Sequence, residues 1–303
     1  AMKKAKELDK IIAAHCEVNS LLNGGYIHAG EYARAHGHRG ICSESEYAQI
    51  ARDLELAAKT GVKYHVCHIS TKESVEIIRQ AKKSGVDVTC ETGPHYLTLC
   101  DSDLQEDGRF KMNPPLRSRS DREALIEGIK DGTIDMIATD HAPHTLEEKA
   151  RGFLEAPNGI IGLECAYGVC HKVLVDGGFI SDERLIELMS VGPAELMGHV
   201  PTDVAALVED YAEPAPTGDD PDGVIAGESD AQPQREGVNR LLDLSRVDDA
   251  DNVDLVVLNA AEEWTVDPEQ FHSKARNTPF GGWQVTGRPL ATIIGSQLMF
   301  SRL

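Results

Sequence analysis

Two histidines and an aspartate stand where three short apolar segments of the sequence end. His15 and His68 each follow such a segment directly, and Asp140 comes two residues after the segment 134–138. These segments have the length and composition of strands buried in a sheet. Since the carboxyl ends of parallel strands lie at one edge of a sheet, we expect the three side chains to converge there. Two imidazoles and a carboxylate suit a divalent ion such as Zn²⁺.

Each of these residues also has an ordinary structural role open to it. Asp140 can cap the turn that follows it, and a single histidine at a strand end is commonly packed into its loop. Of the other histidines, His95 is expected to pack on its own loop. His36 and His38 have the spacing of a metal-binding pair but follow a helix-like segment, so we do not expect them to bind metal.

Two proline-containing loops offer polar groups that a substrate ring could use. Asn113 precedes two prolines that stiffen its loop, and its amide has the donors and the acceptor to match an imide-like edge. Asn158 and Gly159 form a second tight turn, whose backbone groups could do similar work. The alternative is that both loops are only turns.

The elements that must position these residues form a repeating pattern. Expected strands at 11–14, 62–67, 86–90 and 134–138 alternate with helices, and no hairpin signal separates them. Such βα units predict parallel strands. Capping boxes are expected for three of the helices, at Ser43 with Glu46, Ser70 with Glu73, and Ser120 with Glu123. Polar residues after each strand are typical of a TIM barrel, but a barrel needs eight strands and four are visible.

Composition changes sharply after residue 200. Residues 201–252 carry 14 acids and 3 bases, which is −11 of the formal net charge of −20. We therefore expect three parts: a catalytic α/β domain at 1–200, a flexible acidic insertion at 201–252 and a small β unit at 253–303. Within the last part, short strands are predicted at 254–258, 284–285 and 291–294.

The overall charge and the cysteines limit the kind of protein this is. A net charge of −20 argues against binding of nucleic acid or of an anionic membrane surface. Seven cysteines without a CxxC pair are interpreted as reduced core residues, which favours a cytoplasmic protein. No apolar run reaches the roughly 20 residues that span a bilayer. A small molecule is the expected ligand.

Taken together, the motifs resemble the dihydroorotases of the long bacterial type, in the cyclic amidohydrolase group of the amidohydrolase superfamily. The segments that carry the resemblance lie at residues 11–200 and are HCE (15–17), YHVCHIST (64–71), ETGPH (91–95), KMNPPLR (111–117), DGTID (131–135), ATDHAPH (138–144), EEK (147–149) and APNGIIGLE (156–164). Three tail segments look like the C-terminal β-sandwich portion of that family: DLVVL (254–258), EWTV (263–266) and RNTPF (276–280).

The resemblance implies a TIM-barrel-type metal-dependent hydrolase that opens dihydroorotate to N-carbamoyl-L-aspartate in pyrimidine biosynthesis. His15 and His68 would be zinc ligands, and Asp140 would be both a metal ligand and the general acid/base. The groups that would contact the substrate are Asn113, His144 and the turn of Asn158 and Gly159. As protein partners it implies a second copy of the chain or an aspartate transcarbamoylase.

Some features of the family pattern are missing. The family's first strand ends in His-x-His-x-Arg, and a carboxylated lysine or an aspartate bridges its two zinc ions; neither is found in this sequence. The resemblance therefore covers about the second half of a barrel, and we expect this chain alone to have little or no activity. Two alternatives remain open: a non-catalytic scaffold for aspartate transcarbamoylase, and another cyclic amidohydrolase such as a hydantoinase or an allantoinase.

Overall fold

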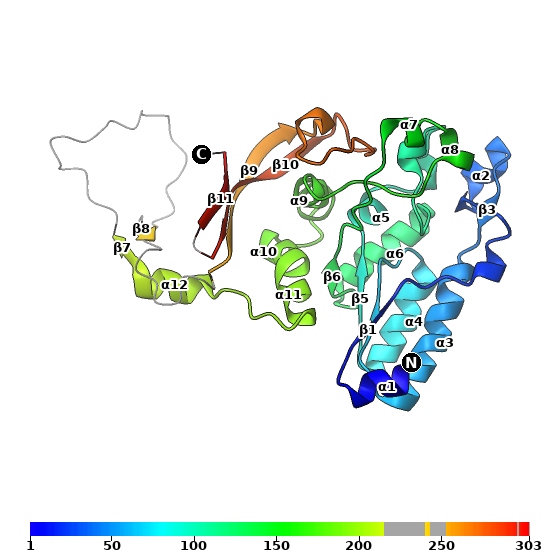
Figure 1. Ribbon diagram of the computed structural model, residues 1–303, viewed down its shortest axis with the longest axis horizontal. Coiled ribbons are helices and arrows are strands. Elements are labelled where there is room, and N and C mark those ends of the chain that lie inside the picture. The colour runs from blue at the N-terminus through cyan, green and yellow to red at the C-terminus, as the bar shows by residue number, and fades with distance from the viewer. Residues whose placement is uncertain (215–239, 243–252, 296, 303) are drawn as a thin grey trace. The chain divides into compact units, whose positions relative to one another are not determined.

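The computed structural model describes residues 1–214, 240–242, 253–295 and 297–302 (Figure 1). The chain divides into two compact units. The larger comprises residues 1–198 and 260–288, and the smaller is drawn from residues 199–259 and 289–303. Every residue predicted to do chemistry lies in the larger unit.

A four-stranded sheet organises the larger unit. Its strands, hydrogen bonded in this order, are β1 (Ile12–Ala14), β4 (Tyr64–Val66), β5 (Val88–Thr92) and β6 (Met136–Ile137). All neighbours are parallel, and Ala13, His65 and Thr89 lie level across the first three strands. The prediction of four parallel strands is confirmed. The third strand was predicted at 86–90, but it begins and ends two residues later, at Val88 and Thr92.

Three long helices follow the first three strands and pack beside one another on one face of the sheet (Figure 1). They are α3 (Glu44–Thr60), α4 (Lys72–Lys83) and α6 (Arg119–Lys130). Their apolar residues recur every three or four positions, which gives each helix one apolar side. These side chains form a buried core with those of the strands, including Ile50, Leu54, Val66, Val75, Ile78, Cys90, Leu125 and Ile129.

The helix starts differ from the predicted capping boxes. Ser43 makes no capping hydrogen bond, and α4 is capped by Thr71 rather than Ser70. The box that opens α6 pairs Ser118 with Asp121, two residues before the predicted one. Several serines and acids stand near each helix start, so spacing alone does not select the residue whose backbone geometry fits the cap.

Shorter elements connect the strands. Between β1 and α3 lie η1 (Asn19–Leu21), β2 (Ile27–His28), α2 (Glu31–His36) and β3 (Gly40–Ile41). After β5 come α5 (Pro94–Thr98), η2 (Asp101–Asp103) and η3 (Gly108–Phe110). After β6 come α7 (Leu146–Lys149), α8 (Gly152–Glu155), α9 (Ala166–Cys170), η4 (His171–Val175), α10 (Asp182–Ile186), η5 (Glu187–Val191) and α11 (Gly192–Leu196).

The described residues after 198 include the helix α12 (Val204–Tyr211), the short antiparallel pair β7 (Ala212–Pro214) and β8 (Arg240–Leu242), and the 3-10 helix η8 (Pro268–Gln270). Most of the acidic segment 201–252, for which flexibility was predicted, lies outside the described residues. A three-stranded sheet is formed by β9 (Leu255–Thr265), β10 (Gln284–Ile294) and β11 (Gln297–Ser301). The two strands predicted at 284–285 and 291–294 are thus one continuous strand, which passes through Gly287.

Among the helices in the described part of the chain, none combines the length and apolar character needed to cross a bilayer.

Candidate active site

His15 and His68 meet at the carboxyl ends of β1 and β4. The Nδ1 atom of His15 lies 3.2 Å from the Nε2 atom of His68, and the two ring centroids are 4.9 Å apart. Because β1 and β4 are parallel neighbours in register, the residues that follow them emerge at the same edge. The structure therefore brings together the two histidines that the sequence predicted as ligands.

The environment of His15 favours its neutral form. Partial burial, followed by the nearby imidazole of His68, lowers the pKa of His15 from its ordinary value. The carboxylates of Glu17 and Asp140 act in the opposite direction but are weaker. A neutral imidazole has a free lone pair, which is the form that binds a metal ion.

Asp140 stands at the mouth of β6 in an unusual backbone conformation. It is exposed, and its φ of 45° is in the left-handed region, as is the φ of 35° at His68. Non-glycine residues adopt this region at a cost, and such strain is often found at functional sites. Asp140 is close enough to influence the pKa of His15. Within the described residues, however, the ligand atoms of His15, His68 and Asp140 are not gathered within 4.8 Å as one group.

Glu17 lies between His15 and Asn113, the residue predicted to contact the substrate. The sequence had not indicated this role for Glu17. Its Oε1 atom accepts a hydrogen bond of 2.9 Å from Asn113 Nδ2, and its Oε2 atom lies 4.0 Å from His15 Nε2. The Oδ1 atom of Asn113 is buried and has no hydrogen-bond partner among the described residues. Asn113 thus keeps an acceptor that a ligand could use. The only signal in the sequence was the position of Glu17, two residues after His15.

His144 and the 158–159 turn lie together, as the predicted substrate-binding role requires. The Nε2 atom of His144 is 2.9 Å from the carbonyl oxygen of Asn158. Gly159 has a φ of 146°, and a Cβ atom there would lie 2.7 Å from the Cβ of Ala142 and 2.9 Å from the His144 ring. Only glycine fits this position without displacing the loop that carries His144.

Two buried side chains from elsewhere hold these loops, and neither was predicted. Asn277 donates hydrogen bonds to the carbonyl oxygens of Ala142 at 2.9 Å and Gly159 at 3.1 Å, and its Oδ1 atom accepts one from the His144 backbone. Lys149 donates to three carbonyl oxygens, those of Lys111, Pro157 and Gly159. The Asp140 loop, the Asn113 loop and the 158–159 turn are therefore fastened to one another.

Three other histidines considered above, His95, His36 and His38, contact groups other than the histidine pair. His95 is buried in α5; burial, and secondarily His68, lower its pKa to about 3, so it stays neutral. The Nδ1 atom of His36 faces the Tyr32 carbonyl oxygen, and His38 lies between the Tyr26 hydroxyl and Glu106.

Comparison with known proteins shows that the chain is similar to dihydroorotases and to a hydantoinase. A family described as dihydro-orotase-like matches residues 1–74. Dihydroorotases of Geobacillus sp. (strain WCH70) and of Brevibacillus brevis are 43% and 44% identical over 303 and 306 residues, which is all of this chain and 61% and 62% of theirs. The solved structure of the L-hydantoinase (dihydropyrimidinase) from Arthrobacter aurescens is 26% identical, with a TM-score of 0.73, over 99% of this chain and 59% of that one.

These similarities confirm the expected fold, an α/β arrangement that matches part of an amidohydrolase barrel and ends in an antiparallel sheet. The chain spans about 61% of the length of the dihydroorotase from Geobacillus sp.. Along its whole length the chain is similar to bacterial dihydroorotases.

Proposed function

We propose that the protein catalyses the reversible hydrolysis of dihydroorotate to N-carbamoyl-L-aspartate, the dihydroorotase reaction of pyrimidine biosynthesis. The observation that carries the proposal is the contact between His15 Nδ1 and His68 Nε2 at 3.2 Å, at the edge of the sheet where the Asn113 and Asp140 loops also emerge. The sequence identity of 43% and 44% to two dihydroorotases, over the whole chain, supports the same activity.

The histidine pair fits zinc. Ligand atoms on a tetrahedral zinc ion lie roughly 3.3 to 3.8 Å apart, which is close to the observed separation of the two imidazole nitrogens. The lowered pKa of His15 keeps one of these nitrogens unprotonated near neutral pH. We propose His15 and His68 as ligands of one ion and Asp140 as a ligand of a second. Zinc bound there would polarise the ring carbonyl and make water a stronger nucleophile.

The chain's own residues would then bind the ring and move a proton. Asn113 would receive the imide edge of dihydroorotate through its unpartnered Oδ1 atom. His144, Asn158 and Gly159 would hold the ring and its carboxylate. Asp140 would accept a proton as the oxygen of water adds to the ring carbonyl carbon. As the carbon–nitrogen bond breaks, it would pass that proton to the ring nitrogen.

Other assignments are separable by experiment. The purified chain is supplied with zinc, and ring opening of dihydroorotate, hydantoin and allantoin is measured side by side, with Asp140→Asn as the control. Since the ranking decides, a low absolute rate does not matter: we expect dihydroorotate to be turned over fastest and Asp140→Asn to abolish the reaction. Faster turnover of hydantoin or allantoin would reject the proposal. No turnover of any substrate, together with co-purification of an aspartate transcarbamoylase, would identify a scaffold instead.

A further inference from the structure

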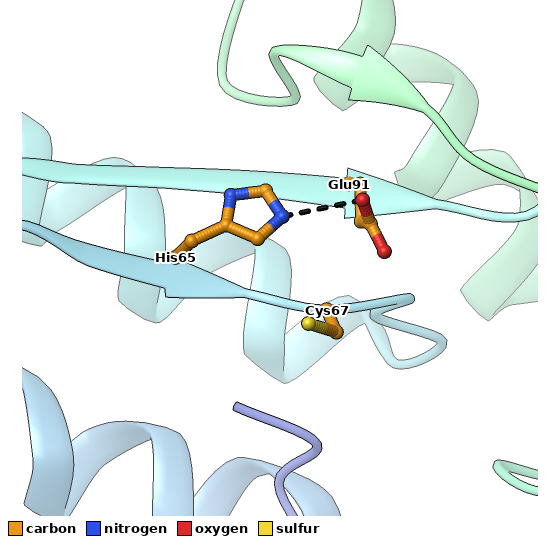
Figure 2. Close-up of side chains that lie close together, drawn as sticks. All are labelled: His65, Cys67 and Glu91. Carbon is orange, nitrogen blue, oxygen red and sulfur yellow. Dashed lines mark hydrogen bonds and ion pairs between the residues drawn. The ribbon is translucent and has the colours of Figure 1, made fainter. Parts of the chain in front are cut away.

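A second group of potential metal ligands, apart from the histidine pair, is formed by His65 on β4, Cys67 directly after β4 and Glu91 on β5. The ligand atoms of His65, Cys67 and Glu91 all lie within 4.8 Å of one another, and within the described residues this is the only such group of three. Figure 2 shows the three side chains close together, with the ring of His65 pointing to the carboxylate of Glu91. None of the three was predicted to bind metal, and Cys67 was expected to be a reduced core residue.

The parallel register explains why these three side chains meet. Residues two apart on a strand point to the same face, which places His65 with Cys67 and, on the next strand, Thr89 with Glu91. His65 is level with Thr89, and Val66 is level with Cys90. Both pairs therefore lie side by side on one face of the sheet.

The hydrogen bonds of His65 orient its ring as a ligand. Its Nδ1 atom is 2.8 Å from the Thr89 hydroxyl, and its Nε2 atom is 3.2 Å from Glu91 Oε2. Without an ion, Nε2 donates its hydrogen to Glu91; in the tautomer that donates the Nδ1 hydrogen to Thr89, Nε2 instead has a free lone pair, and a metal ion would take the place of the hydrogen bond to Glu91. Histidines that bind metal ions characteristically donate their other ring hydrogen to such a fixed partner.

The group is reachable by an ion from solvent. The His65 side chain is buried at 3% exposure, whereas that of Glu91 is 16% exposed and Cys67 is half-buried. One nitrogen, one sulfur and one carboxylate oxygen form a donor set that suits zinc and related ions such as cobalt and cadmium, and suits magnesium or calcium poorly.

We infer that His65 Nε2, Cys67 Sγ and Glu91 Oε2 form a zinc-class metal site that is distinct from the pair of His15 and His68. As the metal–sulfur bond forms, the thiol releases its proton to solvent. Three protein ligands leave one position of a tetrahedral ion open. The site does not depend on the proposed hydrolase activity, since none of its residues belongs to the proposed machinery.

Cobalt spectroscopy separates this site from the histidine pair, because only this site contains sulfur. The metal-free chain is titrated with Co²⁺ while the near-ultraviolet charge-transfer absorption from thiolate to cobalt is recorded. We expect this absorption in the wild type and its loss in Cys67→Ser. Cys42→Ser is the matched control, since Cys42 is also half-buried and makes a single weak contact with a backbone carbonyl oxygen. Thr89→Val, which removes only the partner of Nδ1, should weaken cobalt binding about 10- to 100-fold.

Two further arms keep the result interpretable. His15→Asn should lose the hydrolase activity but keep the absorption from thiolate to cobalt. The two proposals can therefore fail independently of each other. In the wild type, Zn²⁺ should protect Cys67 but not Cys42 from alkylation, as measured by mass spectrometry, which avoids any variant that folds poorly. Cobalt binding without thiolate absorption, or equal alkylation of Cys67 with and without zinc, would overturn the inference and leave His65 and Glu91 as a structural pair.

Discussion

The ammonium group of Lys149 donates a hydrogen bond of 2.8 Å to the carbonyl oxygen of Gly159. The same nitrogen reaches the carbonyl oxygens of Pro157 and Lys111, and Lys149 is 2% exposed. Its charge is thus satisfied by backbone oxygens, and among the described residues no carboxylate accepts a hydrogen bond from it. This arrangement ties the 158–159 turn to the loop of Asn113.

Lys149→Met should therefore loosen both loops. The methionine fills a similar volume but leaves three buried carbonyl oxygens without this donor, so the free energy of unfolding should fall by about 2 to 4 kcal/mol. Urea unfolding followed by circular dichroism measures the change. Lys130→Met is a suitable control, because Lys130 is exposed on α6, where it pairs with Glu127 and its ammonium lies 5.8 Å from the centre of the Phe179 ring, so in the described part of the chain it holds no buried backbone oxygen. Equal effects of the two substitutions would contradict the bridging role.

The same lysine predicts a pH dependence of stability. Burial, and secondarily Lys111, lower the pKa of Lys149 from 10.5 to about 8. Between these values the unfolded chain binds more protons than the folded chain, so the free energy of unfolding rises with pH in this window. The stability of the wild type relative to Lys149→Met should increase from pH 8 to pH 10. A constant difference across these pH values would show that Lys149 stays charged in the folded protein.

Glu46→Gln should destabilise the junction between α3 and α4. The buried Glu46 carboxylate accepts hydrogen bonds from the backbone of Ser70 at 3.0 Å and of Thr71 at 3.1 Å, and pairs with Arg117 at 3.8 Å. Loss of its charge leaves the buried guanidinium without its ion-pair partner, with an expected cost of about 3 kcal/mol. Glu44→Gln, at an exposed residue in the first turn of the same helix, should change stability by less than about 0.5 kcal/mol.

Asn113→Asp tests the proposed substrate contact. The new carboxylate would lie beside Glu17, whose oxygen is now 2.9 Å from the Asn113 amide, and would repel the carboxylate of dihydroorotate. We expect KM to rise at least about tenfold, equivalent to about 1.4 kcal/mol of lost binding, with a smaller change in kcat. Asn19→Asp at an exposed position adds the same charge as a control. An unchanged KM would exclude Asn113 from substrate binding.

Asn277→Ala should release the loop of His144. It removes both amide donors and the acceptor of the His144 backbone hydrogen bond, from a side chain that is fully buried. The free energy of unfolding is expected to fall by about 2 to 4 kcal/mol. In hydrogen-exchange measurements, the exchange rate of the His144 backbone amide should increase more than that of other amides. If exchange increased uniformly instead, Asn277 would be a general core residue.

Local patterns in the sequence determined much of the fold. Short β-branched runs separated by amphipathic helices predicted four parallel strands, because side-chain periodicity and strand length act within a few residues. The same logic predicted that His15 and His68 would meet, since residues that follow parallel strands emerge at one edge. The resemblance to dihydroorotase rested on the same segments and is supported by the comparisons along the whole chain.

Contacts between distant residues were decided only by the tertiary structure. Ser43 and Glu46 have the spacing of a capping box, yet Glu46 turns to the start of α4, where buried donors need an acceptor. Asn277 lies 118 residues from Gly159, and nothing local indicates their contact. The group of His65, Cys67 and Glu91 depends on the register between β4 and β5, which is set by packing of the whole sheet and not by either strand alone.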